Sequence, residues 1–209
     1  MSSDTSRPET ARVLAFDTSA AHCAVAVIGG NQILAQAHEP MTKGQAERLL
    51  VLCQEVMTEA GLTYDDLSAI GVGIGPGNFT GIRISVSAAR GLALGLGIPA
   101  VGISSLEALQ YGAQTPCVCA IDARREQVYA QVFDGKTTHE PKMLDALDLK
   151  PVDGRLIGHG GAPAAYPVAE AIARLSVTRF RDVTERPAPL YMRPADAAPA
   201  RDAPPRILA

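Results

Sequence analysis

Two aspartates and one glycine-rich loop are the residues of this chain best suited to chemistry. Asp17 and Asp122 each follow a short apolar segment, and residues 73–83 read GIGPGNFTGIR. Two aspartates facing each other across a cleft could hold a magnesium–phosphate complex. The alternative is that each carboxylate caps its own turn through local hydrogen bonds. The sequence leaves both interpretations open.

The loop at residues 75–81 lies between an apolar segment and a helical one. Such a loop can direct backbone N–H groups at an anion bound at a helix N-terminus. It is not a P-loop, because no lysine follows its last glycine, and it does not match the dinucleotide fingerprint GxGxxG. The alternative is a tight turn in which Gly81 permits close packing. By itself the loop therefore assigns no function.

Other catalytic or metal-binding patterns are missing from the sequence. The four histidines share no ligand-like spacing, no CxxC is present, and no serine or cysteine lies in a nucleophile elbow. Cys117 and Cys119 alternate within one expected strand, which favours buried thiols. We therefore predict no catalytic residue and no metal site.

Composition and charge limit the partners. Of 209 residues, 47% are apolar and 20% charged, with a net charge of −3 and no basic tract. A protein that binds RNA alone usually presents a basic face, so any nucleic-acid role is expected to run through a partner. The polar N-terminus has no signal-peptide core, and the apolar stretch at 92–103 is interrupted by glycines and Pro99. We predict a cytoplasmic protein with reduced thiols and no membrane contact.

Hydrophobic periodicity outlines the elements. Strands are expected at 13–16, 23–27 and 32–37 as an antiparallel set, then at 69–74 and 100–103. Helices are expected at 43–60 and 80–96, and a third begins at a cap formed by Ser104 or Ser105. The core stripe predicted for the first helix is Ala46, Leu49, Leu50, Cys53, Val56, Met57 and Ala60.

An internal repeat suggests two related lobes. Residues 13–17 (VLAFD) match 118–122 (VCAID), and the alternation at 23, 25 and 27 matches 128, 130 and 132 at the same offset. The expected fold class is α/β. We predict a disordered segment at 1–11, an N-terminal lobe at 12–104, a smaller C-terminal lobe at 105–195 and a flexible tail at 196–209.

The two long helices carry more apolar surface than one lobe needs. The alternative is burial on two sides by the second lobe, which looks too short to cover them. We therefore favour a protein interface, and within it Leu52 is expected to lie outside the core stripe. The predicted interface residues are Leu49, Leu52, Val56, Ile82, Val86, Ala89 and Ala93.

Four segments carry a resemblance to a known family. AFDTSAAHCAVAV, the stretch from GIGPGNFTG to SSLEAL, IDARREQVYAQVF and LYMR together resemble the TsaB (YeaZ) proteins, in the glycoprotease-like M22 group. These are bacterial subunits of the machinery that makes threonylcarbamoyladenosine at position 37 of tRNA. The resemblance, over residues 13–193, implies a duplicated actin-like ATPase (RNase H-like) fold.

The same resemblance bears on catalysis. The paralogue TsaD carries a His-x-x-x-His metal pair, and matching the segments places Ser105 and Leu109 at those positions, where neither residue suits a metal. The resemblance thus implies a non-catalytic scaffold that binds TsaD, with TsaE as a further partner and a homodimer when alone. No cofactor is expected in this subunit, and ATP or ADP only at the interface of the complex. The vestigial phosphate loops would be Asp17, Thr18, Ser19, Gly75, Gly77, Asn78 and Thr80.

The sequence differs from the family pattern at two points, and two alternative functions remain open. Gln45 stands where many family members carry a histidine, and the second lobe is short. One rival is an ATP-dependent phosphotransferase that uses Asp17 and Asp122. The other is a metal-dependent peptidase, against which the missing histidines count.

Overall fold

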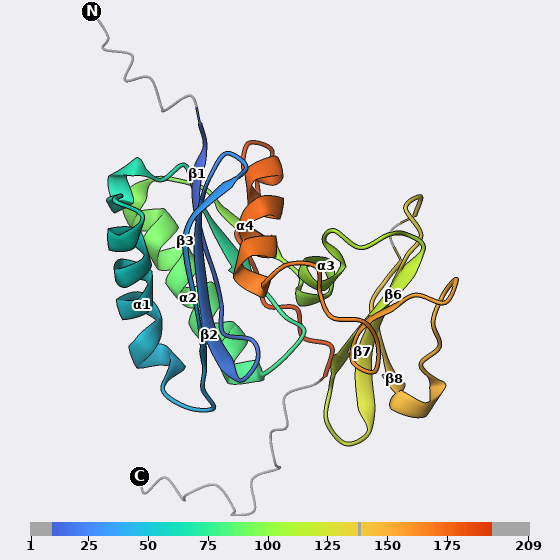
Figure 1. The fold of residues 1–209 in the computed structure, drawn as a ribbon. Coiled ribbons are helices and arrows are strands. Elements are labelled where there is room, and N and C mark those ends of the chain that lie inside the picture. Colours follow the sequence, from blue (N-terminus) through green and yellow to red (C-terminus); the bar gives the residue numbers. More distant parts are fainter. Residues whose placement is uncertain (1–9, 138, 194–209) are drawn as a thin grey trace, which may run out of the picture.

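The protein has two β-sheets, of which the first has helices on both faces and the second is contacted by a short helix (Figure 1). The computed structural model describes residues 10–137 and 139–193. The predicted tail at 196–209, and all of the predicted segment 1–11 except residues 10 and 11, lie outside the described residues. The α/β class and the repeated unit of the RNase H-like fold are confirmed.

The first sheet has the strand order β3-β2-β1-β4-β5. Its antiparallel part consists of β1 (Arg12–Asp17), β2 (His22–Gly29) and β3 (Gln32–Pro40), and β4 (Ala69–Gly73) and β5 (Ala100–Ile103) extend it in parallel. β1 is apolar on both faces because helices cover both: Leu14 and Phe16 face one layer, Val13 and Ala15 the other. The predicted strands of this lobe are thus confirmed.

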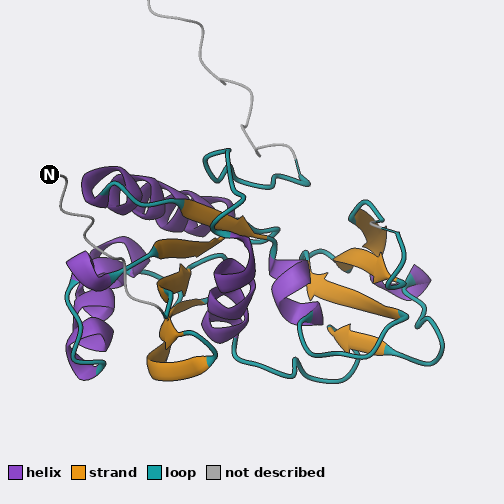
Figure 2. Cartoon of the chain, turned by 90° about the horizontal axis from the view of Figure 1, so that it is seen from above, coloured by secondary structure: helices purple, strands orange, loops and turns teal. Residues whose placement is uncertain are grey.

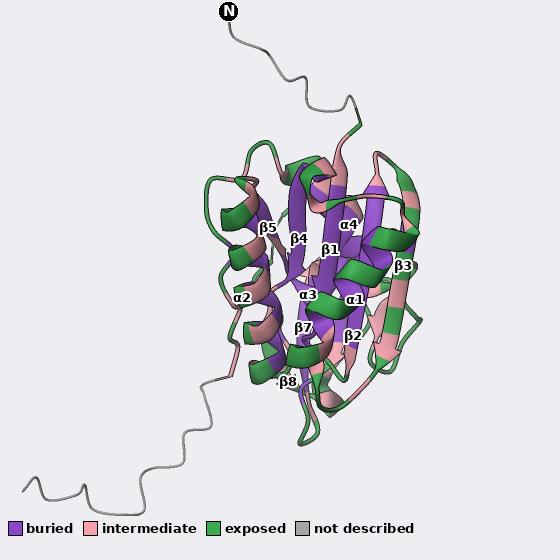
Figure 3. Cartoon of the chain, turned by 90° about the vertical axis from the view of Figure 1, so that its left-hand side faces the viewer, coloured by how far each residue is buried: buried purple, intermediate pink, exposed green. Residues whose placement is uncertain are grey.

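Helices α1 (Gln45–Glu59) and α2 (Phe79–Leu96) cover one face of this sheet (Figures 1 and 3). The alternation of apolar and polar residues at the start of α2 is typical of a strand, but the residues at both ends of the segment favour a helix. The side chain of Asn78 accepts a hydrogen bond from the N–H of Gly81, and Gly97 ends the helix in the left-handed conformation with φ 64°.

The second sheet has the order β8-β7-β6-β9. Figure 2 shows the strands of the two sheets, in orange, as two separate groups. It is built from β6 (Cys117–Asp122), β7 (Gln127–Phe133), β8 (Lys142–Asp145) and β9 (Leu156–Gly158). The hairpin β6–β7 repeats β1–β2, and in both the aspartate that ends the first strand pairs near the start of the second. The short helix α3 (Ser105–Gln110), capped by Ser104, packs on this sheet.

The last helix corrects the predicted boundary of the second lobe. Helix α4 (Val168–Arg179) follows the second sheet in sequence, yet it packs on the free face of the first, against β1, β2 and β4. Ile172 and Ala173 lie in one apolar cluster with Val13 and Ala15. Residues 105–195 therefore do not form one lobe. We call the first sheet with α1, α2 and α4 the first lobe, and the second sheet with α3 the second lobe. The open face of the first sheet requires a cover, and α4 supplies it.

Candidate functional site

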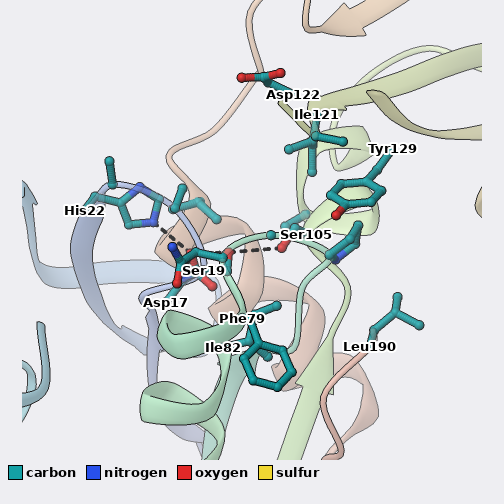
Figure 4. A pocket seen from close by; sticks show the side chains of 18 of the residues that line it. Asp17, Ser19, His22, Phe79, Ile82, Ser105, Ile121, Asp122, Tyr129 and Leu190 are labelled. Carbon is teal, nitrogen blue, oxygen red and sulfur yellow. Dashed lines mark hydrogen bonds and ion pairs between the residues drawn. The ribbon is translucent and has the colours of Figure 1, made fainter. Parts of the chain in front are cut away.

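A turn organised by Asp17 forms the floor of the cleft between the two sheets (Figure 4). The carboxylate is fully buried, and its Oδ2 accepts hydrogen bonds from the backbone N–H of Ser19 (3.1 Å) and the Ser19 hydroxyl (2.9 Å). Nε2 of His22 lies 2.7 Å from the same oxygen. The turn-capping interpretation therefore describes this aspartate in the structure.

The two predicted phosphate loops contact each other directly. The N–H of Asn78 donates to the Ser19 carbonyl at 2.6 Å, and the Thr18 hydroxyl donates to the Gly81 carbonyl at 2.6 Å. A Cβ atom at position 77 or 81 would collide with the carbonyl of Ser19 or Thr18. The close packing expected at Gly81 is thus confirmed. The N–H of Asn78 therefore donates within the chain, to the other loop.

Asp122 lies at the same cleft but in different surroundings. Its carboxylate is exposed, and Oδ1 accepts a hydrogen bond from the N–H of Arg124 at 2.9 Å. In Figure 4, Asp122 is on the far side of the pocket from Asp17. The structure therefore brings the predicted aspartates to one cleft, with a volume of about 920 Å³, while each caps its own turn.

Ser105 and Leu109, the positions compared with the metal pair of TsaD, both line this cleft. The Ser105 hydroxyl lies 3.3 Å from that of Ser19. Among residues 10–137 and 139–193, no three His, Cys, Asp or Glu side chains are placed to share a metal ion. Gln45 also lines the cleft and donates from Nε2 to the Met41 carbonyl at 3.2 Å.

The cysteines are buried thiols, as predicted from their alternation with apolar residues. Burial raises the pKa of Cys23 to about 11 and raises the pKa of Cys53 and of Cys119 further above the ordinary thiol value. Thiols that stay protonated at neutral pH are poor nucleophiles and poor metal ligands. They serve as apolar core residues.

The predicted interface residues are corrected by their burial. Every one of them lies inside the core of the chain: Leu49, Leu52, Val56, Ile82, Val86, Ala89 and Ala93. The helices do keep an uncovered outer face, but other residues form it. Leu50, Val51 and Leu94 are 49%, 51% and 75% exposed. We call this surface the α1–α2 face; Figure 3 looks onto it.

The interface residues in α1 were predicted wrongly because the sequence does not determine which side of this helix faces the sheet. Residues 49–53 read LLVLC, so apolar residues occupy every direction around the helix and several stripes fit the pattern. The stripe that faces the sheet contains Leu49, Leu52, Cys53, Val56 and Met57. Leu50, which was predicted to be core, points outward, and Leu52 points inward.

Sequence reasoning also missed a side-chain cluster beside the cleft. The guanidinium carbon of Arg83 lies 3.9 Å from the ring centre of Phe79, whose ring lies 4.8 Å from that of Tyr191. All three residues lie in segments that the sequence analysis quotes, Phe79 and Arg83 in GIGPGNFTGIR and Tyr191 in LYMR. Nothing in either segment indicates that the two meet in the fold.

Comparisons with known proteins agree on one family. A family model described as TsaD, tRNA N6-adenosine threonylcarbamoyltransferase, matches residues 30–173. The tRNA threonylcarbamoyladenosine biosynthesis protein TsaB of Escherichia coli is 39% identical over 124 residues, which cover 56% of this chain and 53% of that protein. The match therefore spans about half the length of that relative.

Longer matches reach almost the full length of two other proteins. An uncharacterised protein of Mycobacterium tuberculosis is 32% identical, and the match covers 93% of this chain and 97% of that protein. The solved structure of YeaZ from Pseudomonas aeruginosa is 26% identical, with a TM-score of 0.70 over 87% of this chain and 99% of that one. In the described part of the chain, no helix is long and apolar enough to cross a membrane. The chain belongs to the tRNA N6-adenosine threonylcarbamoyltransferase (TsaD) family and, within it, to the TsaB (YeaZ) group.

Proposed function

We propose that this chain is a non-catalytic subunit of the machinery that makes threonylcarbamoyladenosine at position 37 of tRNA, and that it binds TsaD and supports TsaD activity. TsaE joins the complex, and tRNA is bound through the complex, in the cytoplasm. The observation that carries the proposal is a contrast between two surfaces. Oδ2 of Asp17, Oδ1 of Asp122 and the N–H of Asn78 are engaged by the chain itself. In contrast, the α1–α2 face exposes three large apolar side chains, Leu50, Val51 and Leu94.

The state of the cleft argues against chemistry in this subunit. A kinase-like mechanism needs a carboxylate free to bind magnesium and a loop free to bind phosphate. Oδ2 of Asp17 already accepts two hydrogen bonds and contacts His22, and the N–H of Asn78 is engaged by Ser19. No structural observation favours a phosphotransferase that uses Asp17 and Asp122. We expect no ATPase, kinase or peptidase turnover by the isolated chain and no cofactor of its own.

The α1–α2 face suits a helical partner surface. Ser87, Gly91 and Gly95 are exposed on α2 at a spacing of four residues, close to Leu94. A Cβ atom at Gly91 or Gly95 would meet no described atom within 4 Å, so a second helix can approach the backbone closely. Leu94 then supplies a large apolar side chain that would become buried on binding. We propose that TsaD occupies this face, that a second copy of the chain occupies it when TsaD is absent, and that any ATP or ADP is held at the interface of the complex.

The test is a mixing experiment with purified TsaD. Leu94→Glu and Val51→Glu each place a charge in the proposed interface, where central truncations cost about 2 kcal/mol or more. The matched control is Leu147→Glu, at a side chain that is 95% exposed and far from these helices in the second sheet region. We expect light scattering to show loss of the complex with TsaD and of the homodimer for the two interface variants only, with parallel loss of tRNA modification. Normal assembly of both variants with TsaD would refute the assignment of the face.

A separate assay addresses catalysis. Phosphate release from ATP by the isolated chain is compared with that of Asp17→Asn and Asp122→Asn. We expect the unmodified chain to be indistinguishable from buffer. ATP turnover that disappears in either variant would establish the phosphotransferase instead.

A further inference from the structure

The last described residues, 187–193, cross from the first sheet to the second. Pro187 is buried, and its carbonyl accepts a 2.7 Å hydrogen bond from Nε of Arg90 on α2. A Cβ atom at Gly102 of β5 would lie 3.1 Å from Cβ of Pro187, so the proline packs directly on that strand. Three residues later, the N–H of Leu190 donates to the Ile74 carbonyl at 2.8 Å, just beyond the end of β4. This half of the segment is bound to the first lobe.

Tyr191 joins the segment to the start of α2. Its ring contacts that of Phe79, and its hydroxyl accepts a 2.9 Å hydrogen bond from Nε of Arg83. The guanidinium group of Arg83 also lies over the Phe79 ring at 3.9 Å. An arginine held by two aromatic rings and a directed hydrogen bond has a fixed orientation.

The next two residues are bound to the second lobe. Met192 packs against the apolar cluster that contains Leu106, Cys119 and Tyr129. Nη2 of Arg193 donates to Oε1 of Gln127, at the start of β7, at 2.6 Å. The direction of the chain is visible in Figure 1, where the red end of the described chain runs between the two sheets.

We propose that residues 187–193 form a clasp that fixes the opening of the cleft between the lobes. Leu190, Tyr191, Met192 and Arg193 all line the cleft, so the segment is also one of its walls. The two lobes are also joined where β5 leads into α3 and where the chain leaves β9 for α4, and α3 packs against α4 with an ion pair between Glu107 and Arg179 at 3.0 Å. These ties lie at the α3–α4 side of the cleft. The clasp adds a crossing that is tied by side chains at both ends. Breaking either end leaves the lobes held only by those other ties, so their separation is less restricted.

The clasp shares its anchors with the α1–α2 face. Arg83, Ser87, Arg90 and Leu94 follow one another at spacings of four, three and four residues, which places them along one side of α2. Arg83 holds Tyr191 and Arg90 holds Pro187. A protein seated on Leu94 would therefore lie beside both arginines. The clasp itself is independent of whether the partner is TsaD.

The experiment measures the distance between the lobes by electron–electron double resonance. Spin labels are placed at Thr178→Cys on α4 and at Leu147→Cys near β8, both exposed positions outside the clasp and the α1–α2 face. The native cysteines are buried and stay unlabelled. The labelled chain is mixed with an excess of unlabelled chain, so that distances between labels on two different copies do not contribute to the signal.

We expect one narrow distance distribution for the doubly labelled chain. Tyr191→Ala and Arg193→Ala, which release opposite ends of the clasp, should each broaden it or shift it to longer distances. Tyr191→Phe keeps the ring stack but loses the hydrogen bond. Its distance distribution should be broader than that of the unmodified clasp and narrower than that of Tyr191→Ala. The matched control is Arg12→Ala. Arg12 lies away from the clasp and donates a 3.0 Å hydrogen bond to Asp66, so its loss should leave the distance distribution unchanged.

The result that overturns the clasp is an unchanged narrow distribution in both alanine variants. Tyr191 is 43% exposed, so its truncation removes little core, and circular dichroism checks that each variant is folded. If Tyr191→Ala does not fold, Arg193→Ala decides, because it removes a hydrogen bond to Gln127 from a partly exposed side chain and truncates no core residue.

Discussion

The carboxylate of Asp17 rests on the α-carbon of Gly73, in space that any side chain at position 73 would have to occupy. Its Oδ1 is buried and has no hydrogen-bond partner in the described part of the chain, while Oδ2 holds the following turn. Strand β4 therefore fixes the position of a turn at the end of the neighbouring strand β1.

Gly73→Ala should destabilise the fold because the new methyl group collides with Asp17. Overpacking a filled site costs about 1–3 kcal/mol, and we expect a loss of that size in the free energy of unfolding by urea. Gly95→Ala is the control: it lies in α2 with no described atom within 4 Å of its Cβ and should gain about 0.5–1 kcal/mol. Equal stability of the two variants would contradict the packing of Asp17 on Gly73.

Leu52→Ala and Val51→Ala test the corrected phase of α1 with adjacent residues. Leu52 is 2% exposed and Val51 is 51% exposed. Truncating a buried leucine costs about 2–5 kcal/mol, whereas a surface change away from special features stays within about 0.5 kcal/mol. Urea unfolding of the monomer should show a much larger loss in the free energy of unfolding for Leu52→Ala than for Val51→Ala. A loss for Leu52→Ala no larger than that for Val51→Ala would contradict the inward direction of Leu52.

Asn78→Ala should cost about 1 kcal/mol because it removes the N-cap of α2. Asn78→Asp, which keeps an acceptor oxygen, should retain most of that stability. The neighbouring Thr80→Ala serves as the control, since Thr80 is exposed and should change stability by no more than about 0.5 kcal/mol. Thermal unfolding followed by circular dichroism measures all three. If Asn78→Ala left the stability unchanged, the side chain of Asn78 would not stabilise α2 as an N-cap.

The cysteines should resist thiol reagents in the native state. At pH 8 we expect no reaction of the folded chain with Ellman's reagent and reaction of all four thiols after unfolding in guanidinium. Rapid labelling of a native thiol would mean that its core opens readily.

The same burial predicts a pH dependence. The folded pKa of Cys23, about 11, exceeds the ordinary value of 9.0, because burial disfavours the thiolate. Its stabilising contribution is therefore complete below pH 9.0 and is lost as the pH rises towards 11. Cys23→Ala should reduce this alkaline loss in urea titrations at pH 8 and pH 10.5, although the variant is less stable at both. An unchanged alkaline slope would assign the loss to other groups.

The sequence predicted the elements whose signals are local. The strand at 100–103 was placed without error, and the helix predicted at 80–96 begins one residue earlier, at Phe79, directly after its N-cap Asn78. The repeat predicted the hairpin β6–β7 because apolar alternation and a terminal aspartate recur together. These features depend on residues close in sequence.

Features that depend on distant contacts were not predicted. Helix α4 has a helical pattern in Ala169, Ile172, Ala173 and Ser176, but nothing in that pattern indicates that it crosses to the first sheet. The inward direction of Leu52 depends on how α1 rotates against β2, which the run LLVLC leaves undetermined. The stack of Arg83 on Phe79 and Tyr191 likewise joins residues more than a hundred positions apart.

The placement of α4 has a consequence for how the chain folds during synthesis. Strand β1 leaves the ribosome long before α4, and one face of its sheet stays uncovered until residues 168–179 emerge. Such long-range closure slows folding and exposes apolar surface to aggregation meanwhile. A ribosome-bound chain that ends before residue 168 should therefore be held by chaperones, and release should come with the synthesis of α4.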